Sequence, residues 1–280
     1  MKAPFILCTY LRSENFLTFM DSERRTFLNL ILDIDGTLMN GSVAYEGAIS
    51  LVDRLNNENT KYLLMTNSIR KPELQEERLR NAGLDVRKEN ILNPIAAINE
   101  YLKERNIKRA RIIGTDEEIG QVNAECDMER NEIAILLDFE KGNKGYSDLQ
   151  AVLEDMEKGK EVVTASMAQF YYKSGRKTID TGAFAELLEK VGGKKIRNFG
   201  KPSIDYFEIA GRMLAEPPSG IFVVGDDWST DVKGAKEWGA KSILVKTGKY
   251  VVKDEEKEEP FMLIDNLLEL KEYCYAITGK

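Results

Sequence analysis

Short apolar runs alternate along the chain with longer stretches in which apolar residues recur every three or four positions. An apolar run of about four to eight residues is typical of a buried strand, and a three-to-four spacing is typical of an amphipathic helix. The runs that predict strands are 27–34, 61–67, 110–114, 132–139, 160–166, 220–227 and 240–248. The stretches that predict helices are 48–56, 71–84, 95–105, 147–159, 182–193, 204–215, 230–239 and 263–274.

Local signals support several of these helices. Pro72 lies near the start of one and Gly83 near its end, and Ser147 is a candidate N-cap of another. The mixed-charge run 253–259 predicts a solvated loop. Because strands and helices alternate, we expect an α/β fold with a parallel sheet covered by helices on both faces.

Length and charge narrow the classes of protein. A chain of 280 residues is long enough for one large domain or two modest ones, and 42% apolar residues suffice for a core. The formal net charge of -7 disfavours binding to nucleic acid or to an anionic membrane surface. No apolar run approaches the roughly 20 residues that a transmembrane helix needs.

The numbers of cysteine and histidine residues restrict the catalytic mechanisms and metal sites that the chain can have. The three cysteines are scattered and form no C-x-x-C pair, which indicates reduced thiols in a cytoplasmic protein. Histidine is absent, which excludes Ser-His-Asp and Cys-His catalysis and zinc held by histidine. A bound metal would need oxygen ligands, so Mg²⁺ is the expected ion.

Polar residues follow three of the predicted strands. Asp33-Ile34-Asp35-Gly36-Thr37, Thr66-Asn67-Ser68 and Gly225-Asp226-Asp227 stand at strand ends, with Asp231 shortly after the last, and Gly200-Lys201-Pro202-Ser203 precedes a predicted helix. Each segment alone is also compatible with a turn or a helix cap. Ligands bind beyond the carboxyl ends of strands in open parallel sheets. Together the segments predict a pocket for an anion and a metal, since clustered carboxylates near a core need a cation.

The motifs DIDGT (33–37), Thr66, Lys201 and GDDWSTD (225–231), in this order, resemble those of the haloacid dehalogenase-like hydrolase superfamily. The flanking residues resemble subfamily IIA, the p-nitrophenyl-phosphatase or NagD-like proteins with a C2-type cap. The resemblance implies a Rossmann-like catalytic core at 26–104 and 198–280 and an inserted smaller α/β cap at 105–197. Residues 1–25 are then an N-terminal extension, expected to be flexible; a signal peptide or a start at Met20 are the alternatives.

The resemblance also implies residue roles. Asp33 would be the nucleophile that forms an aspartyl-phosphate, and Asp35 the general acid and base. Thr66, the backbone N–H of Asn67, and Lys201 would bind the phosphate. Asp33, Asp226, Asp231 and the backbone carbonyl of Asp35 would hold Mg²⁺, while Asp227 has no assigned role.

The predicted cap departs from the family pattern, which weakens any assignment of the substrate. Ser166-Met167-Ala168-Gln169 replaces a stretch that often carries Asn and Asp, and in the core Glu46 stands where proline is common. The segment Phe170, Tyr171, Tyr172, Lys173 and Arg176 is either a substrate-reading wall or an ordinary strand pair.

The leading hypothesis is a Mg²⁺-dependent phosphatase acting on a small phosphorylated metabolite. Two alternatives stay open. One is a phosphotransferase or mutase with the same intermediate, and the other is a non-catalytic protein that binds phosphate esters. The expected partner is a small-molecule phosphate ester, with neither nucleic acid nor membrane. The resemblance also allows a homodimer formed through the cap.

Overall fold

The computed structural model of the protein describes residues 29–173, 175–251 and 259–270. The predicted extension at 1–25 and nearly all of the predicted loop at 253–259 lie outside the described residues. The chain divides into two compact units. Unit 1 comprises Met1–Met65, Pro72–Ile91 and Ala210–Lys280, and unit 2 comprises Thr66–Lys71 and Leu92–Ile209. The predicted borders of core and cap differ from these divisions and stay a prediction.

The first sheet has six strands in the order β15-β14-β13-β1-β4-β5. Its strands are β1 (Asn29–Leu32), β4 (Tyr62–Met65), β5 (Ile91–Leu92), β13 (Ile221–Gly225), β14 (Lys241–Val245) and β15 (Met262–Ile264). β1 lies between β13 and β4 and pairs with both in parallel, with Ile31 level with Val223 and Leu63. All residues of β1, β4 and β13 are buried, as expected for parallel strands covered on both faces.

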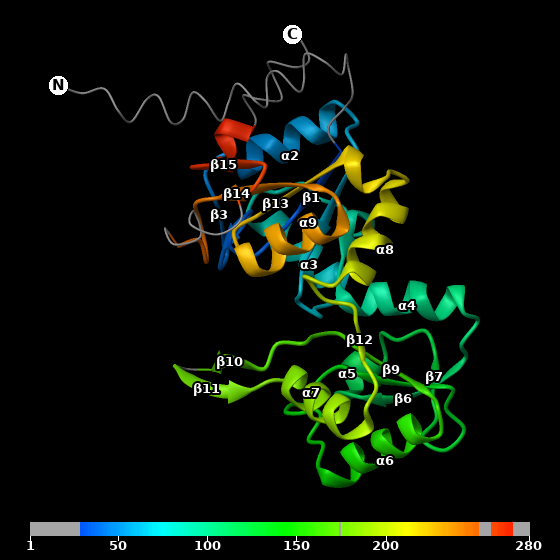
Figure 1. Ribbon diagram of the computed structural model, residues 1–280. Coiled ribbons are helices and arrows are strands. Elements are labelled where there is room, and N and C mark those ends of the chain that lie inside the picture. The colour runs from blue at the N-terminus through cyan, green and yellow to red at the C-terminus, as the bar shows by residue number, and fades with distance from the viewer. Residues whose placement is uncertain (1–28, 174, 252–258, 271–280) are drawn as a thin grey trace, which may run out of the picture. The chain divides into compact units, whose positions relative to one another are not determined.

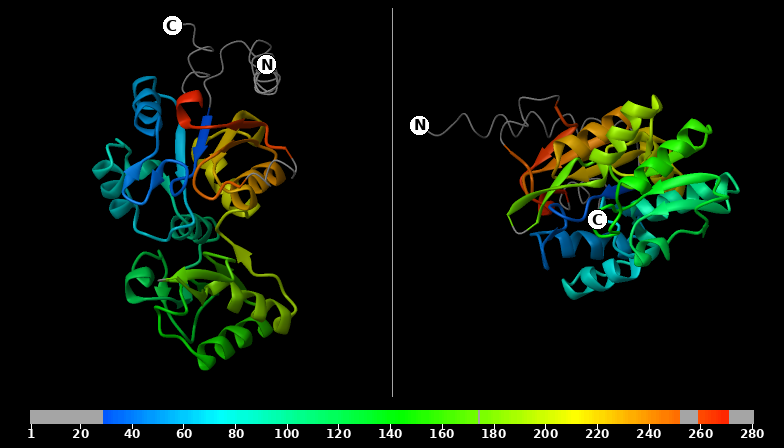
Figure 2. Two further views of the ribbon diagram at one scale, coloured as in Figure 1. Left: turned by 90° about the vertical axis from the view of Figure 1, so that its left-hand side faces the viewer. Right: turned by 90° about the horizontal axis from the view of Figure 1, so that it is seen from below.

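Helices cover both faces of this sheet, as Figure 2 shows in its left view. Within the described residues, the helices of unit 1 include α2 (Ala48–Asn57), α3 (Pro72–Asn81) and α9 (Lys233–Trp238), and the division between the units falls inside α8 (Ile204–Leu214). α2 buries Leu51, Val52 and Leu55, which fall at helical spacing. A small hairpin, β2 (Met39–Asn40) with β3 (Val43–Ala44), follows β1.

The second sheet lies in unit 2 and has five strands in the order β12-β9-β8-β6-β7. They are β6 (Arg109–Ile113), β7 (Glu125–Cys126), β8 (Ile133–Leu136), β9 (Glu161–Thr164) and β12 (Arg197–Asn198), and all pairs are parallel. The helices of this unit are α4 (Pro94–Glu104), α5 (Asp116–Ile119), α6 (Tyr146–Glu157) and α7 (Thr181–Gly192). α6 and α7 pack against one another (Figure 1). An antiparallel hairpin joins β10 (Phe170–Lys173) to β11 (Arg176–Ile179).

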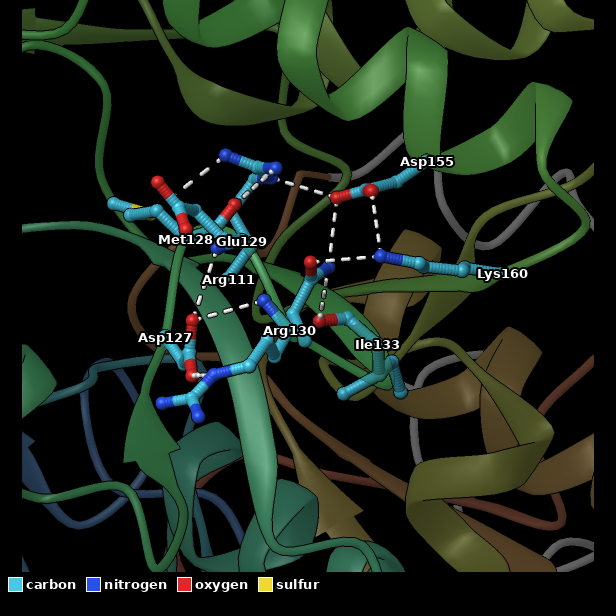
Figure 3. Close-up of polar contacts among 9 residues, drawn as sticks. Arg111, Asp127, Met128, Glu129, Arg130, Ile133, Asp155 and Lys160 are labelled. Atoms are coloured by element: carbon cyan, nitrogen blue, oxygen red, sulfur yellow. Dashed lines mark hydrogen bonds and ion pairs between the residues drawn. The ribbon is translucent and has the colours of Figure 1, made fainter.

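A buried polar network supports the second unit beside its apolar core. Asp155 of α6 is 1% exposed and accepts hydrogen bonds from Arg111 Nε at 2.6 Å, Asn131 Nδ2 at 2.7 Å and Lys160 Nζ at 2.9 Å (Figure 3). The carboxylate therefore joins β6, α6 and the loops before β8 and β9. Buried charges are tolerated when they are paired in this way.

The α/β class predicted from the sequence, a parallel-sheet core with a second, smaller α/β part, is confirmed. Within the described residues, no helix is long and apolar enough to cross a membrane. The strand pair was one of the two readings left open for 170–176, and the structure forms it as β10 and β11.

Two local predictions were wrong. Residues 263 and 264 were assigned to a helix, but they lie in β15, which pairs with β14. Tertiary pairing with an open sheet edge outweighs helical spacing here, and the helix begins only at Leu267. Ser147 is not an N-cap. The cap of α6 is Gly145, whose N–H donates to the side chain of Asp148 at 2.9 Å.

Candidate active site

Two neighbouring strands end in buried carboxylates. Asp33 directly follows β1 and Asp226 directly follows β13. The N–H of Asp33 donates to the carbonyl oxygen of Val224 at 2.9 Å, so the ladder between the strands continues up to Asp33. Asp33 is 7% exposed and Asp226 1%. Because parallel strands end at the same edge of a sheet, the two carboxylates converge there.

A third carboxylate joins them from the turn after β13. Asp231 lies in a short π-helix, Trp228–Val232, and is 2% exposed. Asp33, Asp226 and Asp231 each offer an oxygen, and these oxygens lie within 4.8 Å of one another. Burial raises the pKa of Asp226, and the charge of Asp231 raises it further, against hydrogen bonds from Lys249 and Thr37. Three buried carboxylates form an all-oxygen donor set, which fits a hard divalent cation.

Several segments fix the carboxylate of Asp226. Thr37 Oγ1 donates to Asp226 Oδ1 at 3.0 Å, and the N–H of Lys249 donates to Asp226 Oδ2 at 2.7 Å. Thr247 Oγ1 donates to the carbonyl oxygen of Gly36 at 2.6 Å, which ties the loop after β14 to the turn after β1. Asp226 is therefore held in one place before any ion binds.

Asp227 has a different role from its neighbour. Its carboxylate accepts hydrogen bonds from the N–H of Ser229 at 2.9 Å and from Lys249 Nζ at 3.1 Å. Burial acts to raise its pKa, but a hydrogen bond from the Ser229 hydroxyl and the charge of Lys249 outweigh burial and lower the pKa. Asp227 thus caps the π-helix and pairs with a lysine.

Asp35 is more exposed to solvent than the three buried carboxylates. Its side chain is 50% exposed, and Oδ1 accepts from Arg78 Nη2 of α3 at 2.5 Å. Its backbone is fixed by the turn, in which the N–H of Gly36 donates to the carbonyl oxygen of Met39 at 2.8 Å. A carboxylate in contact with solvent can exchange protons with small molecules, which a buried one cannot do readily.

In unit 2, Thr66 directly follows β4 along the chain and is 4% exposed. Tyr206 of α8 is fully buried, and its hydroxyl lies 2.7 Å from the carbonyl oxygen of Thr66 and 2.8 Å from that of Leu92. The N–H of Thr66 donates to the same Leu92 carbonyl at 3.2 Å. The buried tyrosine thus fixes the backbone that carries the Thr66 hydroxyl.

Asn67 and Lys201 form a two-way pair in the same unit. The N–H of Lys201 donates to Asn67 Oδ1 at 2.7 Å, and Asn67 Nδ2 donates to the carbonyl oxygen of Lys201 at 3.1 Å. Lys201 is 7% exposed. The sequence had suggested a role for the backbone N–H of Asn67. The side chain has a separate one, since it braces the backbone of the lysine.

The structure therefore brings Asp33, Asp226 and Asp231 together in unit 1, and Asn67 and Lys201 together in unit 2. Sequence reasoning assigned no role to Arg78, Tyr206 or Lys249. Lys249 stands one residue beyond the predicted strand 240–248, so its place after a strand of the same sheet was a usable signal. Arg78 and Tyr206 lie inside amphipathic helices and offered none.

The fold and the cluster together define an α/β protein with a cation-competent carboxylate centre where the strands of its main sheet end. Comparison with known families agrees. The model described as haloacid dehalogenase-like hydrolase matches residues 30–129, and the one described as HAD-hydrolase-like matches residues 198–270. The chain belongs to the haloacid dehalogenase-like hydrolases, which confirms the resemblance and the enzyme class predicted from its motifs.

Relatives are similar over most of their length. Phospholysine phosphohistidine inorganic pyrophosphate phosphatase of Mus musculus is 26% identical over 265 residues, covering 90% of this chain and 95% of its own. Haloacid dehalogenase-like hydrolase domain-containing protein 2 of Rattus norvegicus is 28% identical over 238 residues, covering 85% and 91%.

Solved structures share the fold. The p-nitrophenyl phosphatase of Archaeoglobus fulgidus superposes with a TM-score of 0.79 at 21% identity, covering 89% of this chain and 99% of its own. NagD of E. coli superposes with a TM-score of 0.77 at 22% identity, covering 88% and 98%.

Proposed function

We propose that the protein is a phosphatase that hydrolyses the phosphate monoester of a small metabolite through an aspartyl-phosphate on Asp33, with Mg²⁺ as cofactor. The observation that carries the proposal is the buried cluster of Asp33, Asp226 and Asp231 at the strand ends of the main sheet. Relatives named as phosphatases support the reaction class. The proposed partner is a small molecule, and the proposed location is the cytoplasm.

Asp33, Asp226, Asp231 and the backbone carbonyl of Asp35 would hold the ion. When bound, it would offset the repulsion between a carboxylate nucleophile and an anionic phosphate. No histidine is present to share this task.

The remaining roles belong to the chain's own residues. A carboxylate oxygen of Asp33 attacks phosphorus, and the bond from phosphorus to the leaving oxygen breaks as Asp35 gives that oxygen a proton. Asp35 then takes a proton from water, whose oxygen attacks phosphorus and frees Asp33. Thr66 and Lys201 would hold the phosphoryl oxygens, since a hydroxyl and an ammonium both donate to them.

The first test compares wild type with Asp33→Asn in the hydrolysis of p-nitrophenyl phosphate and of a panel of phosphorylated metabolites, with Mg²⁺ and with EDTA. We expect Mg²⁺-dependent phosphate release that falls at least about a thousandfold in the variant, because the nucleophile is lost. Asp53→Asn, an exposed site on α2, is the matched control and should keep full activity.

Three outcomes would replace the proposal. Full activity of Asp33→Asn would remove Asp33 as nucleophile. Phosphate passed to an acceptor hydroxyl instead of water would indicate a phosphotransferase or mutase. Binding of phosphate esters without turnover of any of them would indicate the non-catalytic alternative.

A further inference from the structure

Arg78 belongs to none of the sequence motifs, yet it contacts Asp35, the residue to which proton transfer is assigned. Its Nη2 donates to Asp35 Oδ1 at 2.5 Å and to the carbonyl oxygen of Gly41 at 2.6 Å. All three residues lie in unit 1, so the contacts belong to one compact body. We propose that Arg78 is a positioning residue for Asp35, which it holds by one oxygen so that the other is the oxygen that exchanges protons.

The arginine is better covered than its partner. The Arg78 side chain is 20% exposed, and that of Asp35 is 50% exposed. Half-exposed ion pairs add little to the stability of a fold. The principal effect of this pair is therefore local, on where the Asp35 carboxylate lies.

Both ends of the pair are themselves anchored. Arg78 lies in α3, whose next residue, Leu79, is fully buried in the core. Gly41 lies in the turn of the hairpin formed by β2 and β3, and that hairpin begins with Met39, which accepts from the N–H of Gly36 at 2.8 Å. Arg78 thus joins the helix, the hairpin and the turn that carries Asp35. A change in any of these segments reaches the carboxylate through the guanidinium.

The two oxygens of Asp35 differ as a result. Oδ1 accepts from Arg78, whereas within the described residues no hydrogen bond reaches Oδ2. Oδ1 is therefore occupied by the guanidinium, and Oδ2 is the oxygen left to meet the substrate. The proton that passes to the leaving oxygen, and the proton later taken from water, are therefore carried by Oδ2. This inference rests on the proposed phosphatase reaction.

The test depends on how much the leaving group needs a proton. An alkoxide is a poor leaving group and needs protonation, whereas p-nitrophenolate leaves without it. kcat/KM reports the steps up to departure of the leaving group. In Arg78→Gln we expect kcat/KM to fall about tenfold for an alkyl phosphate, because general acid catalysis typically contributes about 10²–10⁴-fold and is only partly lost. For p-nitrophenyl phosphate we expect a change below about threefold.

Three further variants separate positioning from a structural effect. Arg80→Gln removes the same charge from the same helix, where Arg80 pairs with Glu76 at 2.5 Å, and should change neither substrate. Arg78→Lys keeps the charge but not the forked geometry, and should lie between Arg78→Gln and wild type for the alkyl ester. In an Asp35→Asn background, Arg78→Gln should add no further loss for the alkyl ester, because the arginine acts through Asp35.

These measurements distinguish a failure of the proposed phosphatase function from a failure of the proposed role of Arg78. If wild type hydrolyses neither ester nor any metabolite of the panel, the proposed function fails. If wild type hydrolyses both esters and Arg78→Gln lowers kcat/KM equally for both, or for neither, the role of Arg78 is overturned while the phosphatase stands. An equal loss that tracks a lower melting temperature would assign Arg78 to stability instead.

Discussion

Gly248 lies directly against the carboxylate of Asp226. A Cβ atom on Gly248 would stand 2.1 Å from Asp226 Oδ2 and 2.6 Å from the Cα of Gly36. The backbone of Gly248 is also left-handed, with φ of 50°. Only glycine leaves the space that the carboxylate fills, so the loop after β14 is part of the acidic centre although it contributes no side chain to the cluster.

We expect Gly248→Ala to displace Asp226 and to weaken the binding of Mg²⁺ by about tenfold or more, because displacing one of the three carboxylate ligands costs at least as much free energy as losing a hydrogen bond. Activity at saturating Mg²⁺ should recover in part. Titration of activity against Mg²⁺, together with calorimetric binding of Mg²⁺, measures both effects.

Gly193→Ala is the matched control for Gly248→Ala. Gly193 has a left-handed φ of 65°, and nothing lies within 4 Å of a Cβ placed there. This variant carries the same backbone strain, about 1 kcal/mol, without the clash. An equal loss of Mg²⁺ affinity in both variants would show that strain, and not contact with Asp226, is the cause.

Asn67→Asp should weaken the binding of phosphate. The new carboxylate can still accept from the N–H of Lys201, but it no longer donates to the Lys201 carbonyl, and it brings a negative charge to the lysine. We expect the inhibition constant of inorganic phosphate to rise about tenfold, as for the loss of a hydrogen bond at a charged site. Asn106→Asp makes the same chemical change at an exposed site of unit 2 and should leave this constant unchanged. An unchanged inhibition constant in Asn67→Asp would show that the Asn67 side chain does not position Lys201 for binding phosphate.

The site residues that could be predicted from the sequence are those that directly follow predicted strands. Asp33 and Asp226 could be placed at one edge because each follows an apolar run, and parallel strands bring their carboxyl ends together. Asp231 could be added because it stands a few residues beyond Asp226. The positions of these three carboxylates can therefore be predicted from local spacing and from the rule for parallel sheets, without any knowledge of side-chain packing.

The residues that could not be predicted act through contacts between segments that are far apart in the chain. Arg78 meets Asp35 across 43 positions and Tyr206 meets Thr66 across 140. Both partners lie in helices whose pattern shows only which face is buried. Leu263 and Ile264 were assigned to a helix for a similar reason, since they become part of the strand β15 through pairing with β14. Such assignments require the tertiary structure.

Asp231→Asn should have opposite effects on stability with and without metal. In EDTA we expect a higher melting temperature than wild type, because the charge of Asp231 acts on the buried Asp226 and its removal relieves repulsion. With excess Mg²⁺, wild type should gain about 2.7 kcal/mol at a hundred times the dissociation constant, and the variant less. Thermal unfolding at two Mg²⁺ concentrations decides this. A variant that is less stable than wild type in EDTA would contradict the repulsion between the two carboxylates.

The network around Asp155 makes the stability of unit 2 dependent on pH. Burial acts to raise the pKa of Asp155, but hydrogen bonds from Arg111, Lys160 and Asn131 outweigh it and place the pKa below its usual value (Figure 3). A carboxyl group whose pKa is lowered by folding stabilises the folded state above its unfolded pKa, which is about 3.9 for aspartate. This contribution is lost as the pH falls through the folded pKa.

Asp155→Asn should therefore destabilise the protein by about 3 kcal/mol near pH 7, because it leaves Arg111 and Lys160 without their shared anion. The difference from wild type should be constant above about pH 5 and should shrink as the pH falls below about 4. Urea unfolding of both proteins across this range measures it. Asp148→Asn, on the exposed first turn of the same helix, is the control and should show a much smaller difference. A difference for Asp155→Asn that stays constant to low pH would show that packing, and not the charge, is what Asp155 contributes.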